Sequence, residues 1–149
     1  MQKITINTTI QAPIKDVYDS YLSAEDNKQW NTAGGGWTTG KTTIEAKVGG
    51  RWSTEYISPD GANDFVFGGT YTEIIPNQKI AYAMNPVDQP ISPEDRRVEV
   101  LFEEVEIGKS TKVTVIFDPE NENAIAFQKA GWQNILNNFK GFIEQSYLK

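Results

Sequence analysis

Few kinds of side chain in this sequence could carry acid–base or nucleophilic chemistry. Its 149 residues contain no His and no Cys, which excludes a Ser-His-Asp triad, a cysteine nucleophile and the ordinary zinc sites. Asp118, Glu120 and Glu122 stand close together, but the glycine and spacing of an EF-hand are missing. We therefore expect these acids to decorate the start of a helix. We assign no catalytic residue, no metal site and no cofactor.

One short motif formally matches a phosphate-binding loop, because residues 35–42 have the spacing G-x-x-x-x-G-K-[ST]. A working loop of this kind follows a strand and opens a helix whose first amides hold the phosphates. Here the motif follows helix-like sequence and runs into Thr42–Val48, which has the composition of a strand. We interpret the match as accidental and predict no nucleotide hydrolysis.

The orientation of one carboxylate depends on the register of its strand, Phe65–Ile75. Strict alternation places Phe67 and Tyr71 on the same face as Glu73. That arrangement would bury the carboxylate, raise its pKa and suit it to acid–base catalysis. The alternative is a β-bulge at Gly68-Gly69, which reverses the alternation and turns Tyr71 and Glu73 outward. We favour the bulge, because paired glycines in a strand often mark one.

The periodicity of the chain predicts the elements around these residues. Alternation indicates a first strand over Ile4–Ile10, and two short helices follow, the second capped at Ser23 and ending near Trp30. Residues 31–39 form a glycine-rich loop, and residues 85–95, with three prolines, are a candidate flap at a cavity mouth. Tight turns join six further strands, which should be antiparallel: Thr42–Val48, Arg51–Ile57, Phe65–Ile75, Lys79–Met84, Arg97–Ile107 and Ser110–Phe117.

The end of the chain predicts one long helix, in which apolar residues from Ile125 to Tyr147 recur at steps of three and four. We expect Asp118 to cap this helix and Pro119 to lie in its first turn. Gly131 is unusual, because glycine inside a helix costs about 1 kcal/mol relative to alanine. It suggests close approach, either by a ligand or by core atoms.

The order of these elements indicates an α+β fold. A curved antiparallel seven-stranded sheet would wrap around the long C-terminal helix, with two short helices after the first strand. The length is that of one domain, residues 1–149. A sheet curved around a helix commonly leaves a cavity between the two, and apolar small molecules bind in such places.

Several short motifs, in this order, carry a resemblance to a known family. They are Ile10–Pro13, Val48–Trp52, Gly69–Ile74, Phe102–Glu104 and Gln128–Leu136. With them the chain resembles, nearly end to end, the heat-shock-protein ATPase activator homologue-like family of the START/polyketide-cyclase (SRPBCC) superfamily. The resemblance implies a helix-grip fold with a central apolar cavity. It implies no shared catalytic set.

We expect the cavity to bind an apolar small molecule or a lipid-like ligand. Four Trp, six Tyr and seven Phe are available for its walls, and Gln128 would be the polar group that fixes the orientation of the ligand. The predicted ligand-binding residues are Trp37, Trp52, Phe67, Tyr82, Met84, Phe102, Phe127, Gln128, Gly131, Trp132 and Ile135.

Two other classes of function remain open. A cyclase, isomerase or hydrolase would work through Glu73 or the tyrosines, although we favour a role without catalysis. The resemblance also implies a co-chaperone that assists a heat-shock ATPase, and a homodimer is a further alternative. The net charge of −6 without a basic cluster argues against nucleic-acid binding. With no signal-like or membrane-spanning apolar run, we expect no membrane insertion and a cytoplasmic location.

Overall fold

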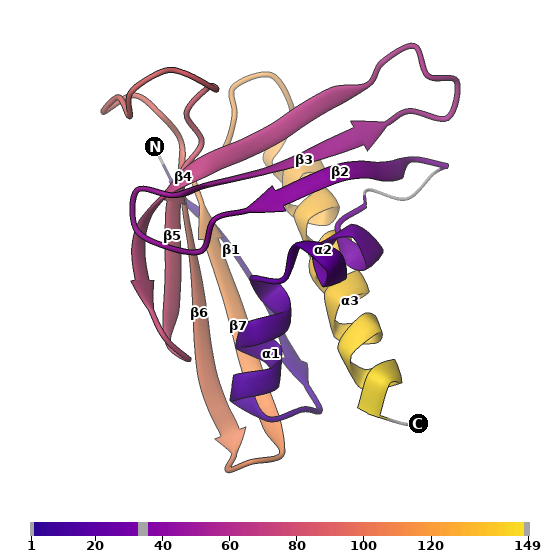
Figure 1. Ribbon diagram of the computed structural model, residues 1–149, viewed down its shortest axis with the longest axis vertical. Coiled ribbons are helices and arrows are strands. Elements are labelled where there is room, and N and C mark those ends of the chain that lie inside the picture. Colours follow the sequence, from indigo (N-terminus) through magenta and orange to yellow (C-terminus); the bar gives the residue numbers. More distant parts are fainter. Residues whose placement is uncertain (1, 33–35, 148–149) are drawn as a thin grey trace.

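A curled antiparallel sheet grips one long helix in the computed structural model, which describes residues 2–32 and 36–147 (Figure 1). The strands are β1 (Ile4–Ile10), β2 (Thr38–Ile44), β3 (Arg51–Ile57), β4 (Phe65–Ile75), β5 (Lys79–Ala83), β6 (Arg97–Glu106) and β7 (Ser110–Phe117). They lie in the order β1-β7-β6-β5-β4-β3-β2 across the sheet. The helices are α1 (Ile14–Tyr21), α2 (Ala24–Trp30) and α3 (Ile125–Tyr147). The predicted helix-grip fold is confirmed.

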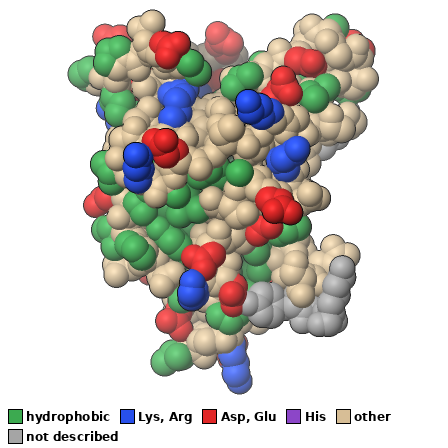
Figure 2. Space-filling model, in the orientation of Figure 1, with side chains coloured by type: hydrophobic (Ala, Val, Ile, Leu, Met, Phe, Trp, Pro, Cys, Tyr) green, Lys and Arg blue, Asp and Glu red, His purple; other side chains and the backbone are tan. Residues whose placement is uncertain are grey.

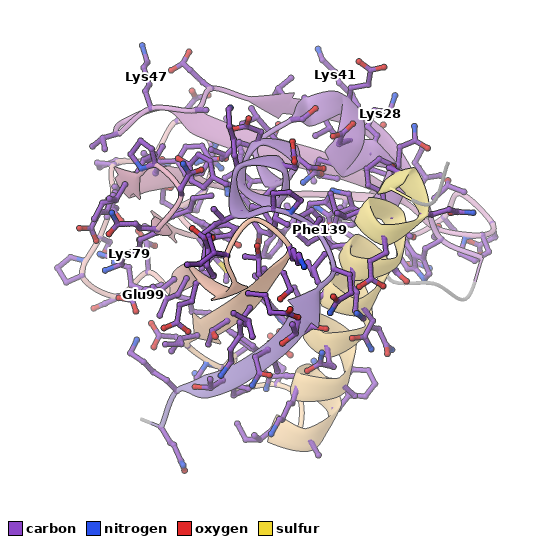
Figure 3. The ribbon with its side chains drawn as sticks, turned by 90° about the horizontal axis from the view of Figure 1, so that it is seen from below. Lys28, Lys41, Lys47, Lys79, Glu99 and Phe139 are labelled. Carbon is purple, nitrogen blue, oxygen red and sulfur yellow. The ribbon has the colours of Figure 1, made fainter. Side chains whose placement is uncertain are left out.

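The core lies where the inner face of the sheet meets α3. Strands β6 and β7 alternate buried and half-buried residues along most of their lengths, as expected for strands with one face on a core. Phe139 of α3 is fully buried, with its ring 4.7 Å from that of Trp30. In Figure 3 Phe139 lies in the interior beside α3, whereas Lys79 and Glu99 lie together on the outer side of the sheet. Hydrophobic side chains also gather toward the middle of the face seen in Figure 2, with charged side chains around them.

The predicted element bounds hold for most of the chain. The hydroxyl of Ser23 accepts a hydrogen bond from the Asp26 amide and caps α2, as predicted. Six of the predicted strands agree with the structure to within one residue. The exception is β2, which is Thr38–Ile44 rather than Thr42–Val48. The chain turns back after Ile44, because the amide of Gly50 bonds to the carbonyl of Lys47.

The long helix begins later than predicted, at Ile125, and Asp118 does not cap it. The Asp118 carboxylate instead accepts hydrogen bonds from Lys3 Nζ at 2.7 Å and from the Arg97 amide at 2.8 Å. Burial acts to raise the pKa of Asp118, but the hydrogen bonds outweigh burial and hold that pKa below its usual value. Asp118 therefore ties β7 to β6 and to the N-terminus. The acids Glu120 and Glu122 lie in the loop before the helix, not in its first turn.

The bulge in β4 lies at a different place from the one predicted. Gly68 and Gly69 pair in regular register with β3, and the shift occurs between Tyr71 and Glu73, opposite β5. Because the irregularity follows Tyr71, that side chain keeps the inward alternation and is buried. Glu73 is turned outward, where its carboxylate pairs with Lys79 Nζ at 2.7 Å. The expected outward turn of Glu73 is confirmed, but that of Tyr71 is wrong.

Candidate functional site

A cavity of about 400 Å³ lies between the sheet and α3. Its wall combines side chains from both short helices, six strands and α3 with residues of the loops. The residues that line it are Ile6, Tyr21, Asn27, Trp30, Asn31, Trp37, Ile44, Trp52, Tyr56, Phe65, Phe67, Tyr71, Tyr82, Arg96, Val115, Glu120, Trp132, Ile135 and Leu136. Aromatic rings dominate, and most of them come from β3, β4 and α3 or from the segments next to these elements.

Ring-to-ring contacts hold the aromatic wall in place. Strand parity brings Trp52 of β3 beside Phe67 of β4 and Tyr82 of β5, with ring centroids 5.6 and 5.2 Å from Trp52. Across the cavity, Trp132 of α3 stacks on Phe117 at 4.0 Å with an interplanar angle of 12°. Each of these rings is therefore fixed by a neighbour in the absence of a ligand.

A chain of hydrogen bonds crosses the wall where α2 meets β3. The Tyr56 hydroxyl donates to Asn31 Oδ1 at 2.7 Å, and Asn31 Nδ2 donates to Asn27 Oδ1 at 3.1 Å. The Thr54 hydroxyl donates to the same Asn27 oxygen at 3.3 Å. The hydroxyls of Tyr56 and Thr54 and the side-chain amide of Asn31 therefore have partners within the protein.

Three further tyrosines bring phenol groups to the cavity. Burial raises the pKa values of Tyr21 and Tyr71, and neighbouring phenols add smaller contributions in the same direction. The pKa of Tyr82 is likewise raised, chiefly by burial. Phenols with raised pKa values stay protonated near neutral pH and can donate hydrogen bonds. They are suited to orient a bound molecule rather than to act as bases.

Six of the eleven residues predicted to bind ligand line the cavity. They are Trp37, Trp52, Phe67, Tyr82, Trp132 and Ile135. Two others lie in the surrounding core: Phe102 packs edge-on against Tyr18 with centroids 5.3 Å apart, and Met84 packs against the same hydrophobic cluster. Phe102 obeys the inward parity of β6 and Met84 continues that of β5 by one residue, but neither lines the cavity.

The remaining three predicted residues lie near the start of α3. The side chain of Phe127 is 70% exposed, and Gly131 is exposed with no heavy atom within 4 Å of where a Cβ would stand. No core atom therefore approaches Gly131 closely, and Gly131 does not line the cavity. Gln128 is buried, but its amide bonds to the backbone of Glu120 and Asn123. Gln128 therefore holds the loop before α3, and its polar atoms already have partners.

Sequence reasoning did not place several other wall residues in the cavity. Tyr56 shares the inward parity of Trp52 along β3, so alternation places it on the inner face of the sheet, although it is not among the predicted ligand-binding residues. Arg96 lies one residue before β6 and is two residues from the buried Val98. Alternation therefore predicts that the side chain of Arg96 also points inward. Asn31 ends α2 with no apolar pattern to mark it, so nothing in the sequence indicated its role. The predicted flap, residues 85–95, contributes no residue to the cavity wall that the structure describes.

The fold and the cavity can be compared with known proteins. The model of the family described as activator of Hsp90 ATPase homolog 1-like protein matches residues 11–144. The chain belongs to this family. The solution structure of the AHSA1-like protein from Aeromonas hydrophila is 30% identical, with a TM-score of 0.81 over 99% of this chain and 96% of that one. A protein from Cytophaga hutchinsonii is also 30% identical, with a TM-score of 0.78 over 97% and 94% of the two chains.

A more distant relative supports the fold of this AHSA1-like protein. The Aha1 dimer from Colwellia psychrerythraea is 20% identical, with a TM-score of 0.72 over 97% of both chains. No match was found among curated proteins. In the part of the AHSA1-like chain that the structure describes, no helix is long and apolar enough to cross a membrane.

The phosphate-loop motif lies in the wrong structural context. Gly35 is outside the described residues, but Gly40, Lys41 and Thr42 lie within β2, so they open no helix. We therefore expect ATP or GTP with Mg²⁺ to leave the melting temperature unchanged, and Lys41→Ala to leave it unchanged as well. A ligand present at a concentration of 100 times its Kd would raise the free energy of unfolding by about 2.7 kcal/mol. A rise in melting temperature with ATP that Lys41→Ala abolishes would contradict this expectation.

Proposed function

We propose that this AHSA1-like protein binds an apolar small molecule in the cavity between the sheet and α3. The observation that carries the proposal is the cavity itself, about 400 Å³ in volume and walled mainly by aromatic rings. Sites for small molecules are commonly concave, apolar and between 300 and 1,000 Å³. The rings hold one another in place through contacts such as that of Trp132 on Phe117. A ligand would therefore enter a largely preformed site, with little ordering of side chains on binding.

Filling the cavity should abolish this binding. Ile135 of α3 lines the cavity, and Ile135→Trp would place an indole in space that a ligand needs. We expect the variant to bind N-phenyl-1-naphthylamine, a neutral apolar dye, at least tenfold more weakly than the parent. Dye fluorescence in a titration measures the Kd, and urea denaturation shows whether the variant is folded.

The same substitution at Ile125 is the matched control. Ile125 lies on the same helix, is 51% exposed and does not line the cavity. Ile125→Trp should therefore bind the dye like the parent, within about twofold. If Ile135→Trp is folded and still binds the dye at the parental Kd, the proposed function is wrong.

A second candidate function is an interaction with a heat-shock ATPase. Family membership favours it, and the start of α3 exposes Ile125 and Phe127 to solvent. Two exposed apolar side chains are common on monomeric proteins, so we rank this candidate second. The dimer formed by the Colwellia relative makes a homodimer the assembly to test by size-exclusion chromatography. The cytoplasmic location stays a prediction.

An enzymatic function has less support than either. Glu73, the carboxylate considered for acid–base work, faces outward and pairs with Lys79. The tyrosines at the cavity stay protonated because burial raises their pKa values. A general base would have to accept a proton within hydrogen-bond reach of the substrate. Neither the Glu73 carboxylate nor the protonated tyrosines can act as a general base in the cavity.

A further inference from the structure

Arg96 lies at the mouth of the cavity. It stands one residue before β6, with the inward parity of the buried Val98 and Val100. Arg96 and Glu120 line both the inner cavity and a crevice on the outer surface formed by residues 93–96 and 118–122. They are therefore the charged residues, within the described parts of the chain, at the boundary between apolar space and solvent.

The guanidinium of Arg96 keeps much of its hydrogen-bonding capacity free. Its Nε donates to the carbonyl of Asp118 at 3.0 Å. Among residues 2–32 and 36–147, no carboxylate forms an ion pair with it. The nearby Asp118 carboxylate binds Lys3, and the Glu120 carboxylate accepts from the side chain of Asn123 in its own loop. The Nη atoms of Arg96 therefore remain available to an acceptor that reaches the mouth.

The cavity wall also offers more hydrogen-bond donors than it satisfies. In the described residues, the buried indole N–H of Trp52 has no acceptor. The hydroxyls of Tyr71 and Tyr82 likewise form no hydrogen bond to a described residue, unlike that of Tyr56. Burial raises the pKa values of these phenols, so they remain donors. Such a wall favours a ligand that carries acceptor oxygens.

We propose that the ligand of this cavity is an apolar molecule with one anionic group, such as a carboxylate or sulfonate, which pairs with Arg96 at the mouth. The inference rests on the proposed function and specifies its ligand class. The apolar body of the ligand lies among Trp52, Phe67 and Trp132, and the anion reaches the Nη atoms of Arg96. A guanidinium binds such groups through two parallel hydrogen bonds, which fixes the orientation of the molecule.

The acids of the outer crevice oppose this pairing but do not cancel it. Glu94 and Glu122 are exposed to solvent, where water and dissolved salt weaken their repulsion of a bound anion. Glu120 is closer, because it lines the cavity together with Arg96. Removing its charge should therefore strengthen anion binding, which provides a reciprocal test of the same site.

Two dyes with the same ring framework separate the charge from the apolar body. The anionic dye is 8-anilinonaphthalene-1-sulfonate, and N-phenyl-1-naphthylamine lacks the sulfonate. We expect Arg96→Gln to weaken the sulfonate dye about tenfold and to leave the neutral dye within twofold. Arg96→Lys, which keeps the charge, should retain most of the affinity for the sulfonate, and Glu120→Gln should increase it.

Arg97→Gln is the matched control, because it removes the same charge one residue away. The Arg97 guanidinium donates to the carbonyls of Asp95 and Ser92 and does not line the cavity. We expect this variant to bind both dyes like the parent. Urea denaturation of each variant establishes that the comparison is made on folded protein.

The outcomes distinguish this inference from the proposed function. If Ile135→Trp weakens the neutral dye but Arg96→Gln weakens neither, the cavity binds apolar molecules and the anion assignment is wrong. The assignment is also wrong if Arg96→Gln and Arg97→Gln weaken the sulfonate dye equally. If the folded parent binds neither dye, both proposals fail.

Discussion

Replacing Phe139 by alanine should lower the free energy of unfolding by about 3–5 kcal/mol, the usual range for deleting a buried aromatic ring. Phe139 is completely buried, and its ring contacts those of Trp30 and Tyr21 with centroid distances of 4.7 and 5.3 Å. The two partner rings come from α2 and α1. The substitution would therefore leave a void where α3 meets both short helices, and the neighbouring rings could close it only in part. Urea denaturation, followed by circular dichroism, measures the loss.

The same substitution at Phe127 is the control for this loss. Phe127 lies on the same helix but is 70% exposed. Phe127→Ala should change the free energy of unfolding by no more than about 0.5 kcal/mol, as surface substitutions usually do. If Phe139→Ala and Phe127→Ala changed the free energy of unfolding equally, the face of α3 that contains Phe139 would not be the face packed against the core.

Much of this packing was predictable from periodicity alone. Leu136, Phe139 and Ile143 follow one another at steps of three and four, and all three are buried. Alternation in β1 likewise predicts the burial of Ile4 and Ile6. Such local patterns predict which residues are buried, because a helix or strand that buries one face has apolar residues spaced at the period of that element.

The start of α3 was not predictable in this way. The sequence Asp118-Pro119-Glu120 satisfies the local rules for a helix N-terminus. The structure gives the Asp118 carboxylate two other partners, Lys3 and the amide of Arg97, which lie far from it in the sequence. These two hydrogen bonds depend on the pairing of β7 with β1 and β6. No pattern of neighbouring residues in the sequence predicts which strands pair.

The composition of the cavity wall was predictable only in part, for a related reason. Apolar periodicity shows that a side chain is buried, but not whether it meets packed atoms or a cavity. Phe102 and Trp52 both face inward, yet Phe102 packs under α1 while Trp52 lines the cavity. At the start of α3, Phe127 and Gly131 are exposed, because they lie off the apolar stripe that contains Leu136 and Phe139. Phe127 stands nine residues before Leu136, which is not a step that brings two residues to one face of a helix, so periodicity could have placed it outside the cavity.

Gly69→Ala should lower the free energy of unfolding by about 1–3 kcal/mol, whereas Gly131→Ala should raise it by up to about 1 kcal/mol. A Cβ at Gly69 would overlap the carbonyl oxygen of Ala83 and stand 3.0 Å from the ring of Tyr82, so the methyl group would push apart two paired strands. A Cβ at Gly131 would meet no atom within 4 Å. That change gains helix propensity without a clash. Urea denaturation of the two variants gives opposite shifts of the midpoint if the glycines of β4 serve close strand packing. A Gly69→Ala variant as stable as the parent would show that β4 and β5 have room for a side chain there, and close packing would not explain this glycine.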